Sequence, residues 1–165
     1  MNIYCENCRL RRAADEALYR VGGLDCPTCG GTMRARPEDI PPAPPGFEWF
    51  DHTFTPEQAA RLIARVPPDS YHWADIPRKA PRAVALYTRL MAEGRWRDET
   101  LERGFYEHPV RFAVDGSLTH GLMRLIACRD SGRPFRAAVF APEGFAATEG
   151  FAATEGFAGE HPQPP

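Results

Sequence analysis

The spacing of hydrophobic residues predicts a helix that begins near Thr55. Thr55, Pro56 and Gln58 combine a capping-box pattern with a first-turn proline, which is typical of a helix N-terminus. The hydrophobic residues that follow recur every three or four positions and would share one helical face: Ala59, Leu62, Ile63 and Val66. We expect the helix to end before Pro67-Pro68, because proline disrupts helical hydrogen bonding.

Two more helices are predicted from the same spacing. The first begins after Pro81 and ends at Gly94, since glycine suits the position just after a helix. Its hydrophobic face consists of Val84, Tyr87, Leu90 and Met91. The second is capped by Thr119 and ends at Ser131-Gly132. Its hydrophobic face consists of Leu122, Leu125 and Ile126.

Strand patterns lie between and after these helices. Hydrophobic and other residues alternate from Val110 to Val114, which predicts a half-buried strand, and Asp115-Gly116 predicts a turn. The apolar run from Phe135 to Phe140 predicts a closing strand. The order helix, helix, strand, helix, strand therefore predicts an α+β fold, a small mixed domain over residues 47–141.

Four cysteines near the N-terminus form two C-x2-C pairs, Cys5 with Cys8 and Cys26 with Cys29, separated by seventeen residues. This spacing is typical of a structural zinc site, in which two turns supply four thiolates at the corners of a tetrahedron. Two disulfides are the alternative, but no secretory signal indicates an oxidising compartment. We therefore expect structural Zn²⁺ in a zinc ribbon over residues 1–35, and a filled site of this kind is not catalytic.

Amino-acid composition distinguishes a linker and a C-terminal tail from the folded domain. Residues 36–46 are rich in proline and predict an extended linker. Residues 142–165 contain the repeated sequence EGFAAT and end in a proline-rich segment, which predicts a disordered tail. Net charge is −2, with the basic residues in the folded part and an acidic tail. This balance permits a local phosphate site, and the lack of a long apolar run predicts a cytoplasmic protein without membrane contact.

One segment resembles a known family. Residues 115–128 read DGSLTHGLMRLIAC and are followed by SGRPF, which is similar to the D-G-x-L-x-x-G-Q-H-R-L-x-A segment of ParB/sulfiredoxin-like domains of the phage and actinobacterial variety. FTPEQAA at residues 54–60 resembles the first helix of that group, and LMAEGRW at 90–96 resembles its M-x-x-G-x-W helix end. The resemblance covers roughly residues 50–141.

The resemblance implies a phosphate or nucleotide site at a helix start. A helix N-terminus favours an anion, and arginine supplies a two-pronged donor. The residues carried over are Thr119, His120, Gly121 and Arg124. Met123 stands where the family has a histidine or arginine, and Leu122 stands where sulfiredoxin has its reactive cysteine, so a sulfiredoxin-type reaction is not expected.

For several candidate residues, a structural role is the alternative to a functional one. Arg124 is alternatively a solvated helix arginine, and His120 a surface turn residue. Cys128 is expected to be a buried, inert thiol. The tryptophans and their neighbours are candidates for base stacking but more often belong to a core: Trp49, Trp73, Trp96, Tyr71 and His72. The acidic residues around position 100 are interpreted as a solvated face: Asp98, Glu99, Glu102 and Glu107.

Three functional hypotheses follow. The first is a zinc-binding, DNA-associated accessory protein from a phage or mobile element, with a degenerate ParB-like domain that binds nucleotide or DNA. The second is an enzyme of the same superfamily, a nuclease, NTPase or kinase, for which Asp115 and Glu107 are the nearby carboxylates. The third is a protein-interaction module in which the ribbon or the tail binds protein partners and the phosphate pocket is vestigial.

Overall fold

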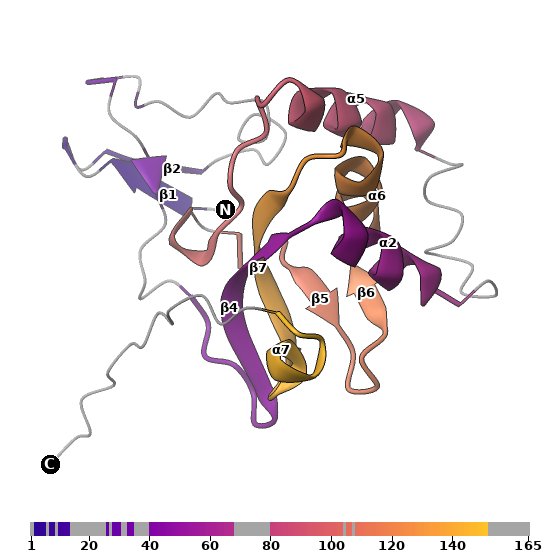
Figure 1. The fold of residues 1–165 in the computed structure, drawn as a ribbon. Coiled ribbons are helices and arrows are strands. Elements are labelled where there is room, and N and C mark those ends of the chain that lie inside the picture. Colours follow the sequence, from indigo (N-terminus) through magenta and orange to yellow (C-terminus); the bar gives the residue numbers. More distant parts are fainter. Residues whose placement is uncertain are drawn as a thin grey trace, which may run out of the picture.

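The computed structural model describes residues 2–5, 7–8, 10–13, 26, 28–30, 33–34, 40–67, 80–103, 105–106 and 108–151. Two sheets are present in this part of the chain (Figure 1). The smaller sheet is antiparallel and has the order β2-β1-β3, from strands Arg11–Ala13, Asn2–Cys5 and Met33–Arg34. The predictions for Tyr71, His72, Trp73 and Glu107 concern residues outside the described part of the chain.

The larger sheet is mixed and has the order β4-β7-β5-β6. Its strands are β4 (Phe47–Phe54), β7 (Phe135–Pro142), β5 (Val110–Phe112) and β6 (Leu118–His120). β4 pairs with β7 antiparallel along their full eight residues, β7 with β5 in parallel, and β5 with β6 antiparallel. Because side chains alternate along a strand, each strand sends every second residue to the same face of this sheet.

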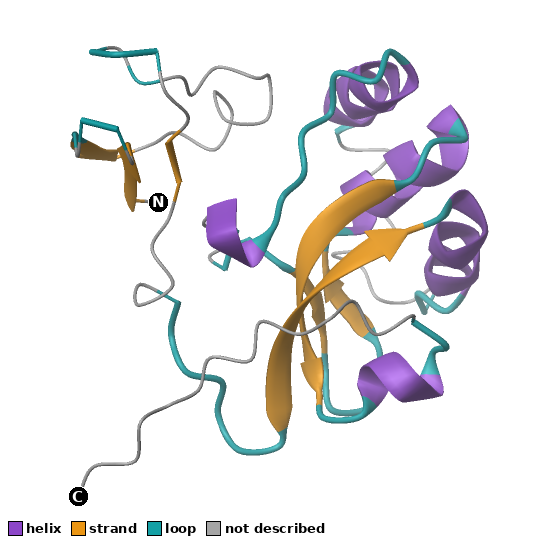
Figure 2. Cartoon of the chain, turned by 60° about the vertical axis from the view of Figure 1, so that its left-hand side comes forward, coloured by secondary structure: helices purple, strands orange, loops and turns teal. Residues whose placement is uncertain are grey.

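Helices cover one face of the larger sheet, and the short 3-10 helix η2 (Leu101–Arg103) lies on the other side (Figure 2). The α-helices among the described residues are α2 (Pro56–Ala64), α5 (Pro81–Ala92), α6 (Leu122–Ser131) and α7 (Phe145–Thr148). α6 packs against both α2 and α5, which explains why most of its residues are buried. The central core includes Phe54, Leu62, Met91, Val110, Phe112, Leu125 and Val139.

The three predicted helices are confirmed, and so are the strands near 110 and 135. Thr55 and Gln58 form the capping box, since Gln58 N–H donates to Thr55 Oγ1 at 3.2 Å and Thr55 N–H donates to Gln58 Oε1 at 3.0 Å. The prediction of Thr119 as a helix cap is wrong. Thr119 lies within β6, and α6 starts from Gly121, whose φ of 105° is accessible mainly to glycine.

In the described part of the larger sheet domain, two strands and the short helix α7 were not predicted. β4 contains Glu48, Asp51 and His52 among its aromatic residues, so its sequence lacks a simple two-residue alternation. β6 is only three residues long. Residues 40–46 form no helix or strand, as expected for the proline-rich segment, although Ile40 packs against the sheet domain.

The fold continues past residue 141, so the prediction of a disordered tail from residue 142 is wrong at its start. β7 extends to Pro142, and α7 follows within the first copy of the EGFAAT repeat. Phe145 is buried against Phe112 with ring centroids 4.3 Å apart, and Phe151, from the second copy, is stacked on His52 at 3.9 Å. The two phenylalanines belong to the hydrophobic core, which composition alone does not reveal.

Replacing Phe151 by alanine should destabilise the protein substantially. The ring is 6% exposed and contacts aromatic rings from β4 and α7, so its removal leaves a cavity in the core. We expect a loss of about 3 kcal/mol or more in the free energy of unfolding, measured by urea denaturation. Ala147→Gly on the exposed side of α7 is the comparison for local helix effects, and an unchanged stability of Phe151→Ala would show that the ring is not part of the core.

His52 should make stability depend on pH. Burial lowers the pKa of this histidine from its ordinary value of 6.5, although the hydrogen bond to Gln58 opposes the shift. The unfolded chain therefore binds the proton more readily than the folded one, so stability falls as the pH drops below about 6.5. In His52→Phe, urea denaturation between pH 7.5 and 5 should show a smaller acid-dependent loss than in the native protein. An identical loss in both would contradict the assignment.

Among the helices in the described part of the chain, none has the length and apolar character required to cross a membrane.

Candidate metal centre

The four predicted cysteines come together in the structure. Their sulfur atoms all lie within 4.8 Å of one another. Cys5 Sγ is 3.4 Å from Cys29 Sγ, and Cys8 Sγ is 3.3 Å from Cys26 Sγ. With Zn–S bonds of about 2.3 Å, the sulfurs of a tetrahedral site are roughly 3.8 Å apart. The donor set and its spacing therefore fit one metal ion bound by four thiolates.

Two tight turns position the cysteines. Cys5 ends strand β1, and its N–H donates to the Leu10 carbonyl oxygen at 2.9 Å, which closes the turn that contains Cys8. In the second pair, Gly30 N–H donates to the Cys26 carbonyl oxygen at 2.8 Å. Gly30 has a φ of 70°, so the turn needs a residue that tolerates the left-handed region. Each C-x2-C spacing thus produces a turn that directs two thiols toward one point.

Hydrogen bonding prepares one of these thiols for metal binding. Burial alone raises the pKa of Cys26, but the backbone N–H groups of Thr28 and Cys29 and the neighbouring Cys8 thiol lower it to about 6. The lowered pKa favours the thiolate, which is the form that binds metal. For Cys8 the backbone hydrogen bond from Leu10 opposes the rise, but contacts with the other thiols raise its pKa to about 12.

The cysteine cluster is also attached to the larger sheet domain. Cys5 and Cys26 are buried, whereas Cys8 and Cys29 are exposed. The buried pair belongs to a second hydrophobic cluster with Leu101, Phe105 and Ala138, and Trp49 is packed at its edge. Sequence reasoning assigned the ribbon a separate position beyond a linker and missed this contact. A metal at the cysteines would therefore hold the N-terminal segment against η2 and β7.

The residues predicted to bind phosphate lie together at the β6–α6 junction, but they point to different partners. Thr119 Oγ1 donates to the Arg111 carbonyl oxygen at 3.1 Å. His120 is half-buried, with its ring centroid 6.3 Å from that of His108. Gly121 is buried, and a Cβ there would lie 3.1 Å from Val110 Cγ2 and 3.3 Å from Arg124 Nη2. The glycine is therefore required for close packing within the domain.

Arg124 is turned into the core. Its side chain is only 3% exposed, its Nη1 donates to Glu99 Oε2 at 2.5 Å, and its Nη2 donates to the Pro109 carbonyl oxygen at 3.0 Å. This geometry does not support Arg124 as a phosphate ligand, and it also corrects the alternative of a solvated helix arginine. A charge this deeply buried is retained because it is paired and hydrogen-bonded.

The interpretation of the acidic residues around position 100 as a solvated face is wrong for Glu99. Glu99 is 1% exposed, and its backbone bridges to β7, with N–H donating to Arg136 O at 2.8 Å and O accepting from Ala138 N–H at 2.6 Å. The signal that could have located this pair is the position of Arg124 within an otherwise apolar helix surface. An arginine in such a place requires a carboxylate from another segment.

The remaining candidate residues have structural surroundings. Cys128 is buried in α6, as expected, and burial raises the pKa of its thiol to about 12, which disfavours the reactive thiolate. Asp115 lies exposed in the β5–β6 turn and accepts a hydrogen bond from Ser117 N–H at 2.9 Å. Hydrogen bonds from Ser117 lower the pKa of Asp115, so this carboxylate is ionised and supports the turn.

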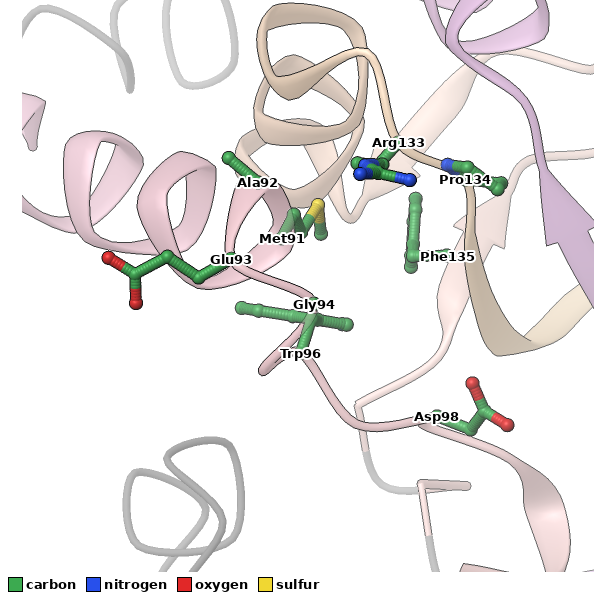
Figure 3. Close-up of a pocket in the computed structure, with 9 residues that line it drawn as sticks. All are labelled: Met91, Ala92, Glu93, Gly94, Trp96, Asp98, Arg133, Pro134 and Phe135. Atoms are coloured by element: carbon green, nitrogen blue, oxygen red, sulfur yellow. The ribbon is translucent and has the colours of Figure 1, made fainter.

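A pocket of about 350 Å³ lies between the end of α5 and the start of β7 (Figure 3). Met91, Trp96 and Phe135 give it an apolar wall, and its charged lining residues are Glu93, Asp98 and Arg133. Trp96 also packs edge-on against Tyr87, with ring centroids 5.0 Å apart. Trp96 therefore supports the end of α5, as expected for a tryptophan that belongs to the core.

Comparisons with protein-family models, with curated proteins and with solved structures found no match for this chain. The resemblance to ParB/sulfiredoxin-like domains therefore stays a hypothesis drawn from the order of short motifs.

Proposed function

We propose that the chain is a zinc-binding protein whose metal centre is structural. The observation that carries this proposal is the clustering of four cysteine sulfurs within 4.8 Å. A four-thiolate site has no open coordination position for a substrate, so its contribution is to folding. Because Cys5 and Cys26 pack against Leu101 and Phe105, the metal would stabilise the contact between the ribbon and the sheet domain as well as the ribbon itself.

We also propose that the protein is a nucleic-acid-associated accessory factor, with a degenerate ParB-like domain over most of residues 50–141. The supporting observations are the order of motifs in the sequence and the basic excess of the folded part, which carries fourteen basic and twelve acidic residues over 47–141. The buried position of Arg124 requires that contacts to phosphate come from other residues.

Two measurements test these proposals. Metal analysis of the purified chain should give one zinc per chain, and a different metal or none would contradict the first proposal. Binding of labelled DNA and RNA by the zinc-loaded protein, measured at several salt concentrations, tests the second. If the protein binds neither DNA nor RNA at any of these salt concentrations, the second proposal is contradicted. Turnover of nucleoside triphosphates with Mg²⁺ or Mn²⁺ would favour the enzyme hypothesis instead.

A further inference from the structure

An aromatic and basic row crosses all four strands of the larger sheet on one face. Trp49 of β4 is directly opposite Phe140 of β7, and Phe140 is paired with Arg111 of β5. Arg111 is paired with His120 of β6 beside a register shift, so His120 follows Arg111 although Leu118, two residues earlier, is paired with Phe112. Residues that are directly paired across strands project to the same face. The strands therefore bring four residues that are far apart in sequence into one line: Trp49, Phe140, Arg111 and His120.

The centre of this row is a stacked column. The rings of Phe47 and Phe140 are parallel, with centroids 5.0 Å apart and planes 6° apart. The Arg111 guanidinium carbon is 5.4 Å from the Phe140 ring centroid. Since Phe47 occupies one side of the Phe140 ring, we place the guanidinium on the other. Trp49 packs on Phe140 at 4.6 Å, and its Nε1–H donates to the Pro41 carbonyl oxygen at 3.0 Å, which fixes the indole.

This column is open to solvent at its Arg111 end. Arg111 is exposed, and Phe47, Trp49 and Phe140 are half-buried. Helices α2, α5 and α6 lie on the opposite face of the sheet (Figure 2). The cluster of Cys5, Cys26 and Leu101 lies on the same side as the row and covers its Trp49 end, so the solvent-exposed part is around Arg111. In the part of the chain that the structure describes, no carboxylate forms an ion pair with Arg111. Glu48 of β4 belongs to the other face and accepts a hydrogen bond from Gly144 N–H at 3.1 Å. Asp51 of β4 lies on the same face as the row, where it accepts a hydrogen bond from Leu101 N–H at 2.8 Å and is 3.9 Å from Arg136 Nη2.

We propose that this face binds single-stranded nucleic acid, with a base stacked on the Arg111 guanidinium or the Phe47 ring and a phosphate on the Arg111 N–H groups. This inference rests on the proposed nucleic-acid function and deepens it by naming the surface and the ligand class. Planar rings and a planar guanidinium bind bases of any sequence, and the positive charge matches the phosphate backbone. A duplex is disfavoured, because its bases are already stacked on one another and are not free to lie on these groups.

Four variants of the zinc-loaded full chain test the inference by fluorescence anisotropy with labelled single-stranded DNA and RNA. Arg111→Ala should weaken binding at least about fivefold and reduce the salt slope by about 0.7, the value for one phosphate contact on a single strand. Arg111→Lys should keep the salt slope but remain weaker, because an ammonium group does not stack. Phe47→Leu should weaken binding by a similar factor and leave the slope unchanged. Arg82→Ala, an exposed arginine on α5, is the matched control for charge and should bind as the native protein does.

The outcomes separate this surface from the broader proposal. If duplex and single strand bind equally and Arg111→Ala and Phe47→Leu match Arg82→Ala, the surface is wrong but the nucleic-acid function stands. If the protein binds no nucleic acid, both the proposed surface and the proposed nucleic-acid function are contradicted. The row is then better explained as a contact for a protein partner. Melting curves of every variant show whether a loss of binding reflects unfolding, and Phe47→Leu retains apolar bulk at a half-buried position for this reason.

Discussion

Replacing Cys26 by serine is expected to abolish stoichiometric zinc binding and to lower the melting temperature sharply. Cys26 is one of four sulfurs in the centre, and its side chain is also buried against the sheet domain. A metal that binds only the folded state contributes about 4 kcal/mol at a thousandfold excess over its dissociation constant. The measurement is zinc content per chain together with thermal unfolding, each with and without a chelator.

The matched control is Cys128→Ala, which removes a buried thiol distant in sequence from the two pairs. This variant should keep one zinc per chain, even though the core change reduces its stability. Hydrogen exchange adds a local readout: in Cys26→Ser, amides near Leu101 and Phe105 should lose protection, because the ribbon no longer covers them. Native zinc content and native protection in Cys26→Ser would refute the account of the centre.

Breaking the buried pair of Arg124 and Glu99 should have the second largest effect. Arg124→Ala leaves the buried Glu99 carboxylate, which is 1% exposed, without its guanidinium partner. Glu99→Ala likewise leaves the buried Arg124 guanidinium without its carboxylate partner. Removing one partner of a buried ion pair typically costs about 3–5 kcal/mol. We expect losses of this size in the free energy of unfolding for each single variant, measured by urea denaturation.

A double variant distinguishes a structural role for Arg124 from a role in binding. Glu99→Leu combined with Arg124→Met replaces both charges by apolar groups, which is often neutral or stabilising relative to the pair. The double variant should therefore recover most of the stability that the single variants lose. If it folds and still binds nucleic acid as the native chain does, Arg124 is structural; a folded double variant that has lost binding would return Arg124 to the phosphate site.

The sequence reveals features that depend on local spacing. The C-x2-C pairs predict the cysteine cluster because two residues between cysteines fix the geometry of each turn. The amphipathic helices at 56–64 and 81–92 are predicted because their hydrophobic faces repeat with the helical period and proline or glycine marks their ends. Each C-x2-C pair and each helical face lies within a short stretch of the chain, so recognising it needs no knowledge of the fold.

Features that depend on contacts between distant segments could not be predicted in this way. Glu99 and Arg124 are 25 residues apart, and only the fold shows that both are buried. Phe145 and Phe151 are part of a repeat whose composition indicates disorder, yet their rings fill positions in the core. The row from Trp49 to His120 requires the strand order β4-β7-β5-β6, which no local pattern contains.

Zinc-edge X-ray absorption of the purified full-length chain tests the central claim most directly, because it reports the ligands of the bound metal. The account predicts one zinc with a shell of four sulfur atoms at about 2.3 Å, supplied by Cys5, Cys8, Cys26 and Cys29. A shell in which oxygen or nitrogen replaces sulfur, or a chain that binds no zinc, would contradict it.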